Sequence, residues 1–123
     1  MPGTPVTHNA KTHALGYSYS EDPNFMYCAE DITTEGSYND WWLASCALSG
    51  GSSGGPWTQS QDENLGTGPV MSLNSWGYTG QPGMAGPLLY GDNSKAECLL
   101  ARAKIEDFPS DPGDGTAGVA GCN

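Results

Sequence analysis

The chain has little positive charge and no long apolar run. Four lysines and arginines stand against 14 aspartates and glutamates, so its 123 residues carry a net charge of −10. Phosphate backbones and anionic membranes attract clusters of basic side chains. We therefore expect neither nucleic acid nor a membrane as a partner. Residues 1–20 hold no apolar stretch long enough for a signal peptide or a membrane span, so we expect neither there.

Residues that bind metals are few, and none of their spacings is typical of a metal site. The chain has two histidines, and its four cysteines form no C-x-x-C pair of the kind that binds zinc. Neighbouring acidic residues do not follow the spacing of a calcium-binding EF-hand loop. Such pairs occur at Glu21–Asp22, Glu30–Asp31 and Asp62–Glu63. We expect no metal and no cofactor, and we interpret these acidic side chains as solvated surface.

Glycine and proline are abundant and divide the chain into short segments. The 18 glycines and 9 prolines exclude long helices through most of the sequence and favour a β-rich fold. Short β-prone runs at 25–29, 41–46 and 70–76 are bounded by turn residues, and each predicts a strand.

One helix is predicted near the C-terminal end. Ser94–Glu97 is a capping box, in which a serine and a glutamate three residues apart satisfy the first free N–H groups of a helix. Apolar residues follow at helical spacing, so we predict a helix over about 95–104. Residues 1–108 then suffice for one domain, and the Gly-, Asp- and Pro-rich tail 109–123 is predicted to be loosely ordered.

Residues Gly50–Trp57 read GGSSGGPW and are the stretch best suited to chemistry. A serine becomes a nucleophile where the backbone bends tightly and exposes its hydroxyl beside free N–H donors, and glycines allow that bend. Two other interpretations exist. Gly/Ser runs serve as flexible linkers, although Cys46 and Trp57 flank this one closely. Gly51–Gly55 fits the G-x-S-x-G elbow of α/β-hydrolases, but Pro56 and a polar run follow where that elbow needs a helix.

The order of several motifs resembles that of trypsin-like (chymotrypsin-fold) serine proteases. Cys46–Trp57 is similar to the nucleophile loop of their secreted bacterial and fungal branch. The other matching segments, in family order, are Ala14–Tyr17, Met26–Cys28, Asn74–Tyr78 and Gly83–Pro87. The resemblance covers roughly residues 14–104. It implies an all-β fold, an antiparallel Greek-key barrel like the C-terminal half of such an enzyme, followed by a short C-terminal helix.

By this resemblance, Ser53 is the nucleophile of a serine endopeptidase. The N–H groups of Gly51 and Ser53 then form the oxyanion hole, which stabilises the negative oxygen of the tetrahedral intermediate. The segment Ser75, Trp76 and Gly77 resembles the strand that pairs with a bound peptide.

The sequence also departs from the family. The family's catalytic histidine and aspartate precede the nucleophile on a separate barrel, and too few residues precede Ser53 here for such a barrel. His8 and His13 do not resemble the family's histidine motif. Ser52 stands where trypsin-type enzymes carry an aspartate that pairs with a new N-terminus, and 47–49 hold no acid that would select a basic residue. The chain thus resembles half a protease, which we expect to be inactive in isolation.

The four cysteines predict two disulfides and hence an oxidising or extracellular compartment. Their spacing leaves all three pairings open. The resemblance implies Cys28 with Cys46, because the branch keeps cysteines at these places, and this leaves Cys98 with Cys122.

Two functional hypotheses follow. In the first, the chain carries the nucleophile and oxyanion hole of a serine endopeptidase whose substrate is a peptide or protein. The histidine and aspartate then come from a missing N-terminal barrel or from a partner chain. In the second, the chain is a non-catalytic binding or structural subunit that docks through Ser75–Gly77 or an exposed barrel face. An imidazole nitrogen within about 3.5 Å of the Ser53 hydroxyl would favour the first.

Overall fold

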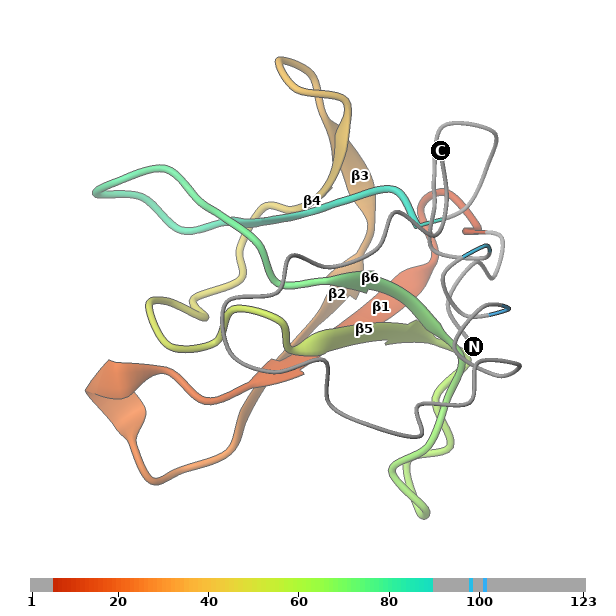
Figure 1. The fold of residues 1–123 in the computed structure, drawn as a ribbon, viewed down its shortest axis with the longest axis horizontal. Coiled ribbons are helices and arrows are strands. Elements are labelled where there is room, and N and C mark those ends of the chain that lie inside the picture. Colours follow the sequence, from red (N-terminus) through yellow and green to blue (C-terminus); the bar gives the residue numbers. More distant parts are fainter. Residues whose placement is uncertain (1–5, 90–97, 99–100, 102–123) are drawn as a thin grey trace, which may run out of the picture.

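The computed structural model describes residues 6–89 together with Cys98 and Ala101. Within residues 6–89 the chain forms strands and one 3-10 turn, which confirms the predicted all-β class (Figure 1). The helix predicted over 95–104 and the tail 109–123 lie outside the described residues, apart from Cys98 and Ala101. In the described part of the chain, no helix has the length and apolar character needed to cross a membrane. The elements are β1 (Lys11–Gly16), η1 (Tyr19–Glu21), β2 (Met26–Asp31), β3 (Thr33–Glu35), β4 (Asp40–Leu43), β5 (Pro56–Gln59), β6 (Val70–Leu73) and β7 (Met84–Gly86).

The strands form two antiparallel sheets that join at two corners. One sheet has the order β2-β1-β5-β6 and the other the order β3-β4-β7. Ile32 alone separates β2 from β3, so these two strands form one bent strand shared by both sheets. Beyond β6, Trp76 forms a bridge with Ala85 of β7. The strand pairing therefore closes into a barrel, and β1 pairs with β5 and β4 with β7 across long connections, as in a Greek key.

The alternation of β1 explains how this strand is oriented. Thr12, Ala14 and Gly16 are buried, whereas the residues between them are not, so one face of the strand lies against the core. β2 pairs with β1 along its whole length, and Ala14 faces Cys28 across the pair. A shift of one residue would turn every buried side chain outward, so this pattern specifies the register.

The predicted strands exist, with different ends, and the structure adds strands that the β-prone runs did not predict. The runs at 25–29, 41–46 and 70–76 correspond to β2, β4 and β6. Among the added strands, β5 lies between β1 and β6 and buries Trp57, Thr58 and Gln59. Its first residue is Pro56, a strand position that proline tolerates. Because β5 follows the glycine-rich loop, Ser53 lies between β4 and β5.

The core lies inside the barrel, and a disulfide fastens one side of it. Trp57 is completely buried at the centre. The Cys28–Cys46 disulfide connects β2 to the turn after β4, which confirms the predicted pairing. Cys122, the predicted partner of Cys98, lies outside the described residues. The buried apolar cluster consists of Ala14, Ile32, Leu43, Cys46, Leu48, Trp57, Met71 and Met84.

Candidate functional site

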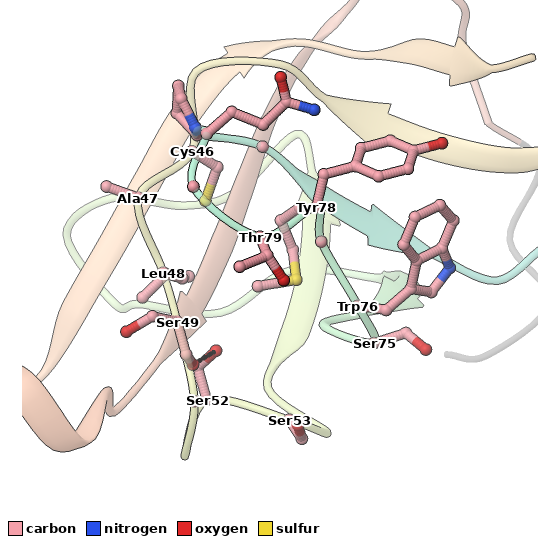
Figure 2. A pocket seen from close by; sticks show the side chains of 17 residues that line it. Cys46, Ala47, Leu48, Ser49, Ser52, Ser53, Ser75, Trp76, Tyr78 and Thr79 are labelled. Atoms are coloured by element: carbon pink, nitrogen blue, oxygen red, sulfur yellow. Dashed lines mark hydrogen bonds between the residues drawn. The ribbon is translucent and has the colours of Figure 1, made fainter.

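Ser53 lies on an exposed loop at the edge of a cleft (Figure 2). The cleft has a volume of about 670 Å³, which is within the range of ligand-binding pockets. One wall comes from residues 46–53 and the other from residues 75–84. The structure therefore places two predicted site segments on one cleft, the Ser53 loop and the segment Ser75–Gly77.

Gly51 takes a backbone conformation that other residues rarely adopt. Its φ is +98°, and a Cβ at this position would lie 3.0 Å from the ring of Tyr19. The N–H groups of Gly51 and Ser53 donate no hydrogen bond to any other described residue. The Ser53 loop therefore has two backbone donors without a partner among the described residues, and the side chain of Ser53 itself is exposed.

Hydrogen bonds between neutral groups hold the loop in this shape. Ser52 is buried, and its hydroxyl donates to the carbonyl of Ser49 at 2.7 Å. The N–H of Ser49 donates to the buried hydroxyl of Ser18 at 2.9 Å. The N–H of Tyr19 donates to the carbonyl of Gly50 at 2.8 Å. The buried hydroxyl of Ser52 is therefore satisfied without a charged partner.

Asn74 joins three parts of the site, and the sequence analysis did not single it out. Its side chain is buried, and its Nδ2 donates to the carbonyls of Leu15 at 2.9 Å and Ser52 at 3.0 Å. Its Oδ1 accepts a 2.7 Å bond from the indole N–H of Trp57. One amide thus connects the end of β1, the loop that carries Ser53 and β5. The signal in the sequence was a polar residue directly after the apolar strand 70–73.

The segment Ser75–Gly77 has one paired edge and one free edge. The N–H of Ser75 donates to the carbonyl of Ala85 at 3.0 Å, and the carbonyl of Trp76 accepts the N–H of Ala85 at 2.7 Å. The carbonyl of Ser75 and both backbone groups of Gly77 have no hydrogen-bond partner among the described residues. A free strand edge of this kind can pair with an extended peptide.

The side chains that line the cleft carry no charge, whereas carboxylates lie beside its second wall. Asp40 accepts the indole N–H of Trp76 at 2.8 Å. Glu35 accepts the phenol of Tyr78 at 2.7 Å, and this bond holds the pKa of Glu35 below its ordinary value. The same bond raises the pKa of Tyr78, because it favours the protonated phenol.

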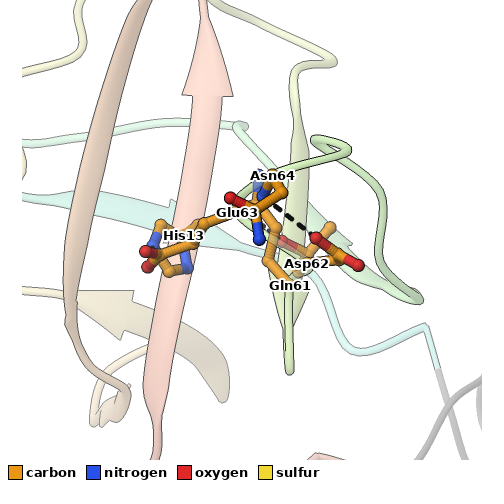
Figure 3. A network of polar contacts seen from close by, with 6 residues as sticks. His13, Gln61, Asp62, Glu63 and Asn64 are labelled. Atoms are coloured by element: carbon orange, nitrogen blue, oxygen red, sulfur yellow. Dashed lines mark hydrogen bonds and ion pairs between the residues drawn. The ribbon is translucent and has the colours of Figure 1, made fainter.

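Neither histidine lies on the cleft that holds Ser53. His13 pairs with Thr58 on β5, and its Nε2 lies 3.6 Å from a Glu63 carboxylate (Figure 3). Its buried Nδ1 has no hydrogen-bond partner among the described residues. The residue of β1 that approaches the nucleophile loop is Gly16, three residues and about 10 Å further along the strand.

His8 contacts the ring of Trp41, away from the cleft. Within residues 6–89, therefore, neither histidine lines the cleft that holds Ser53. Within the part of the chain that the structure describes, no group of three or more histidines, cysteines and acidic residues is arranged to hold a metal ion.

Comparisons with known proteins give one structural relative. No protein-family model matches the sequence, and no curated protein is significantly similar to it. The structure is similar to that of the thermostable serine protease AL20 from an extremophilic microorganism, with 28% sequence identity and a TM-score of 0.57. The match covers 69% of this chain and 40% of that protein, so the chain spans less than half of its relative. The described barrel therefore has a fold like that of a serine protease.

Proposed function

We propose that this chain is the nucleophile-bearing domain of a trypsin-like serine endopeptidase, of the secreted bacterial and fungal type. The observation that carries the proposal is the exposed Ser53 at a cleft edge, beside the free N–H groups of Gly51 and Ser53. The free edge of Ser75–Gly77 forms the opposite wall and suits an extended peptide. The similarity to a serine protease supports this assignment.

In the proposed reaction, the Ser53 hydroxyl attacks the peptide carbonyl, and a covalent acyl-enzyme forms as the amine leaves. The negative oxygen of the intermediate accepts hydrogen bonds from the N–H groups of Gly51 and Ser53, and one such donor is worth about 3 kcal/mol in known cases. The proton of Ser53 must pass to a base, and His8 and His13 do not line the cleft. A histidine and an aspartate from an N-terminal barrel or a partner chain complete the site.

The Cys28–Cys46 disulfide supports an oxidising compartment for this domain. We therefore place the working enzyme outside the cell. Structural disulfides are rare in proteins of the reducing cytosol.

The second candidate is a non-catalytic subunit that binds peptides without cleaving them. The separation of both histidines from Ser53 favours it. In that case, the free edge of Ser75–Gly77 would still bind an extended segment, and Ser53 would have no chemical role.

A fluorophosphonate probe that reacts with activated serines separates the two candidates. The isolated chain should label slowly at Ser53. A serine protease that lacks its general base accelerates its reaction only about 10³- to 10⁴-fold over the uncatalysed reaction in water. Addition of a histidine-bearing N-terminal barrel should accelerate labelling. Ser53→Ala should abolish it, and Ser45→Ala, at an exposed serine outside the cleft, should not. If Ser53 is labelled in neither sample, the endopeptidase proposal is wrong and the non-catalytic binding subunit is the candidate that stands.

A further inference from the structure

Next to the cleft lies a second, smaller pocket that the proposed chemistry does not use. Its lining consists of Tyr38, Asp40, Trp76 and Tyr78, and its volume is about 430 Å³. We call it the aromatic pocket. Trp76 follows Ser75, and Tyr78 comes two residues later; Figure 2 shows both rings projecting away from Ser49 and Ser53. Trp76 and Tyr78 line both the cleft and the aromatic pocket, so the two pockets are neighbours.

Three aromatic rings form the walls of the aromatic pocket. The rings of Tyr38 and Trp76 have centroids 5.2 Å apart and are nearly perpendicular, at 86°. Trp76 and Tyr78 show the same relation, at 5.2 Å and 88°. Perpendicular rings present both faces and edges to a central group, and ring faces attract cations within about 6 Å.

The walls are held in place by contacts outside the pocket. The Tyr78 phenol is bonded to Glu35, which also accepts the N–H groups of Ser37 and Tyr38 at 2.8 and 2.9 Å. Behind the walls, Trp42 contacts Tyr78 with ring centroids 5.8 Å apart. The pocket is therefore preformed, so its side chains lose less conformational entropy when a ligand binds.

Charge determines which ligand suits this pocket. Asp40 contributes a carboxylate whose Oδ2 accepts the Trp76 indole, and its Oδ1 has no hydrogen-bond partner among the described residues. Lys11 is the only lysine or arginine within residues 6–89, and it lies on β1, next to a different pocket. A cation in the aromatic pocket therefore meets a carboxylate and ring faces, with no basic side chain of these residues to compete.

We propose that the aromatic pocket of Tyr38, Asp40, Trp76 and Tyr78 binds a lysine or arginine side chain of the peptide that occupies the cleft. The link to a bound peptide rests on the proposed function, because the peptide would have to run along Ser75–Gly77. The preference for a cation does not rest on it. The uncharged cleft next to Ser53 and the acidic aromatic pocket would then select different side chains of one substrate.

The test follows the indole N–H signal of Trp76 by NMR while a peptide is added. The probes are acetyl-Ala-Lys-Ala-Lys-Ala-amide and a twin with norleucine in place of lysine, which has a similar length and no charge. The lysine peptide should bind about two- to fivefold more tightly, the factor expected for one exposed cation–π contact. High salt should reduce this difference.

Single substitutions test whether the aromatic pocket causes the preference for the lysine peptide. Asp40→Asn retains an oxygen for the Trp76 bond and removes the charge, and Tyr38→Leu removes one wall. Each should abolish most of the preference for lysine. Asp31→Asn, which removes an exposed charge on β2, is the matched control and should leave the preference unchanged. An equal loss in Asp31→Asn and Asp40→Asn would overturn the inference, since general attraction to an acidic protein would then explain it.

The remaining outcomes separate the inference from the proposed function. Equal binding of both peptides overturns the cation pocket and leaves peptide binding along Ser75–Gly77 in place. If neither peptide binds but n-butylguanidinium shifts the Trp76 signal, the cation pocket is supported and the proposed peptide path is wrong. If none of the three probes shifts the signal, the inference is overturned.

Discussion

The phenol of Tyr78 donates to a carboxylate oxygen of Glu35 at 2.7 Å, across 43 positions of sequence. This bond joins the strand that forms one wall of the cleft to the β3–β4 hairpin. Glu35 also accepts two N–H groups of the hairpin turn, so one carboxylate fixes the turn and the wall together.

The first prediction concerns the pH dependence of this bond. Glu35 has a lowered pKa in the folded state, so its bonds stabilise the fold at a pH above its ordinary value of 4.5. That contribution is lost as the pH falls through the lowered pKa. Tyr78→Phe should move the pKa of Glu35 upward and make stability less dependent on acid. NMR titration of the Glu35 carboxyl group measures this, and an unchanged pKa would show that Tyr78 is not the cause.

The second prediction concerns Tyr78, whose contribution to stability is lost at alkaline pH and not at acid pH. Its pKa is raised in the folded state, so its bond stabilises the fold below its ordinary value of 10.0 and is lost as the pH rises through the raised pKa. Ultraviolet titration should find one tyrosine that ionises later than the others, and Glu35→Gln should remove this difference. Tyr27→Phe, at an exposed tyrosine on β2, is the control and should leave the late tyrosine in place.

The third prediction concerns Asn74, whose buried amide makes three hydrogen bonds. Asn74→Ala leaves the Trp57 indole and two carbonyls without this partner. Each buried polar group that loses its hydrogen-bond partner, and cannot bond to water instead, lowers the stability by about 1–3 kcal/mol. We expect the free energy of unfolding in urea to fall by about 2–4 kcal/mol. Asn64→Ala, at an exposed turn, should change it by less than about 0.5 kcal/mol.

The fourth prediction separates two effects at the glycines of the nucleophile loop. Gly51 and Gly54 both have positive φ values, +98° and +82°, so alanine is strained at either position. Only a Cβ at Gly51 would approach the Tyr19 ring, because nothing lies within 4 Å of a Cβ at Gly54. Gly51→Ala should therefore slow fluorophosphonate labelling of Ser53 more than Gly54→Ala does. Equal effects would show that the contact with Tyr19 does not matter.

The fifth prediction concerns the Cys28–Cys46 disulfide, whose cysteines are 18 residues apart. Replacement of both cysteines by alanine should lower the free energy of unfolding by about 3 kcal/mol, because the unfolded chain gains freedom when a loop of this length is opened. Urea unfolding measures the loss. Mass mapping of the non-reduced protein checks the connectivity, and a peptide that joins either cysteine to another one would contradict the structure.

The sequence predicted the parts of the protein that depend on local patterns. Glycine and proline content excluded long helices, and the order of short motifs indicated a protease-like barrel with Ser53 on a loop between strands. β1 illustrates why such prediction works, since alternate burial along a strand follows from the pleat of its backbone.

β5 shows where local patterns fail. Pro56 and the polar residues Thr58 and Gln59 do not read as a buried strand. Gln59 is buried because its amide bonds Thr7 and the Thr12 hydroxyl, which lie 52 and 47 residues earlier in the sequence. These partners are neighbours only after the barrel has closed, so no window of sequence around Gln59 contains the reason for its burial.

By itself, therefore, the sequence determined the all-β class, the glycine-rich loop that carries Ser53 and, through the resemblance, the Cys28–Cys46 pairing. Only the tertiary structure decided that Ser53 and Ser75–Gly77 share one cleft, that the histidines His8 and His13 lie away from it, and that Asn74 holds the loop. It also decided that Tyr38, Asp40, Trp76 and Tyr78 line one shallow pocket. The physical reason is that these relations depend on contacts between distant residues, which form only when the sheets close around the core.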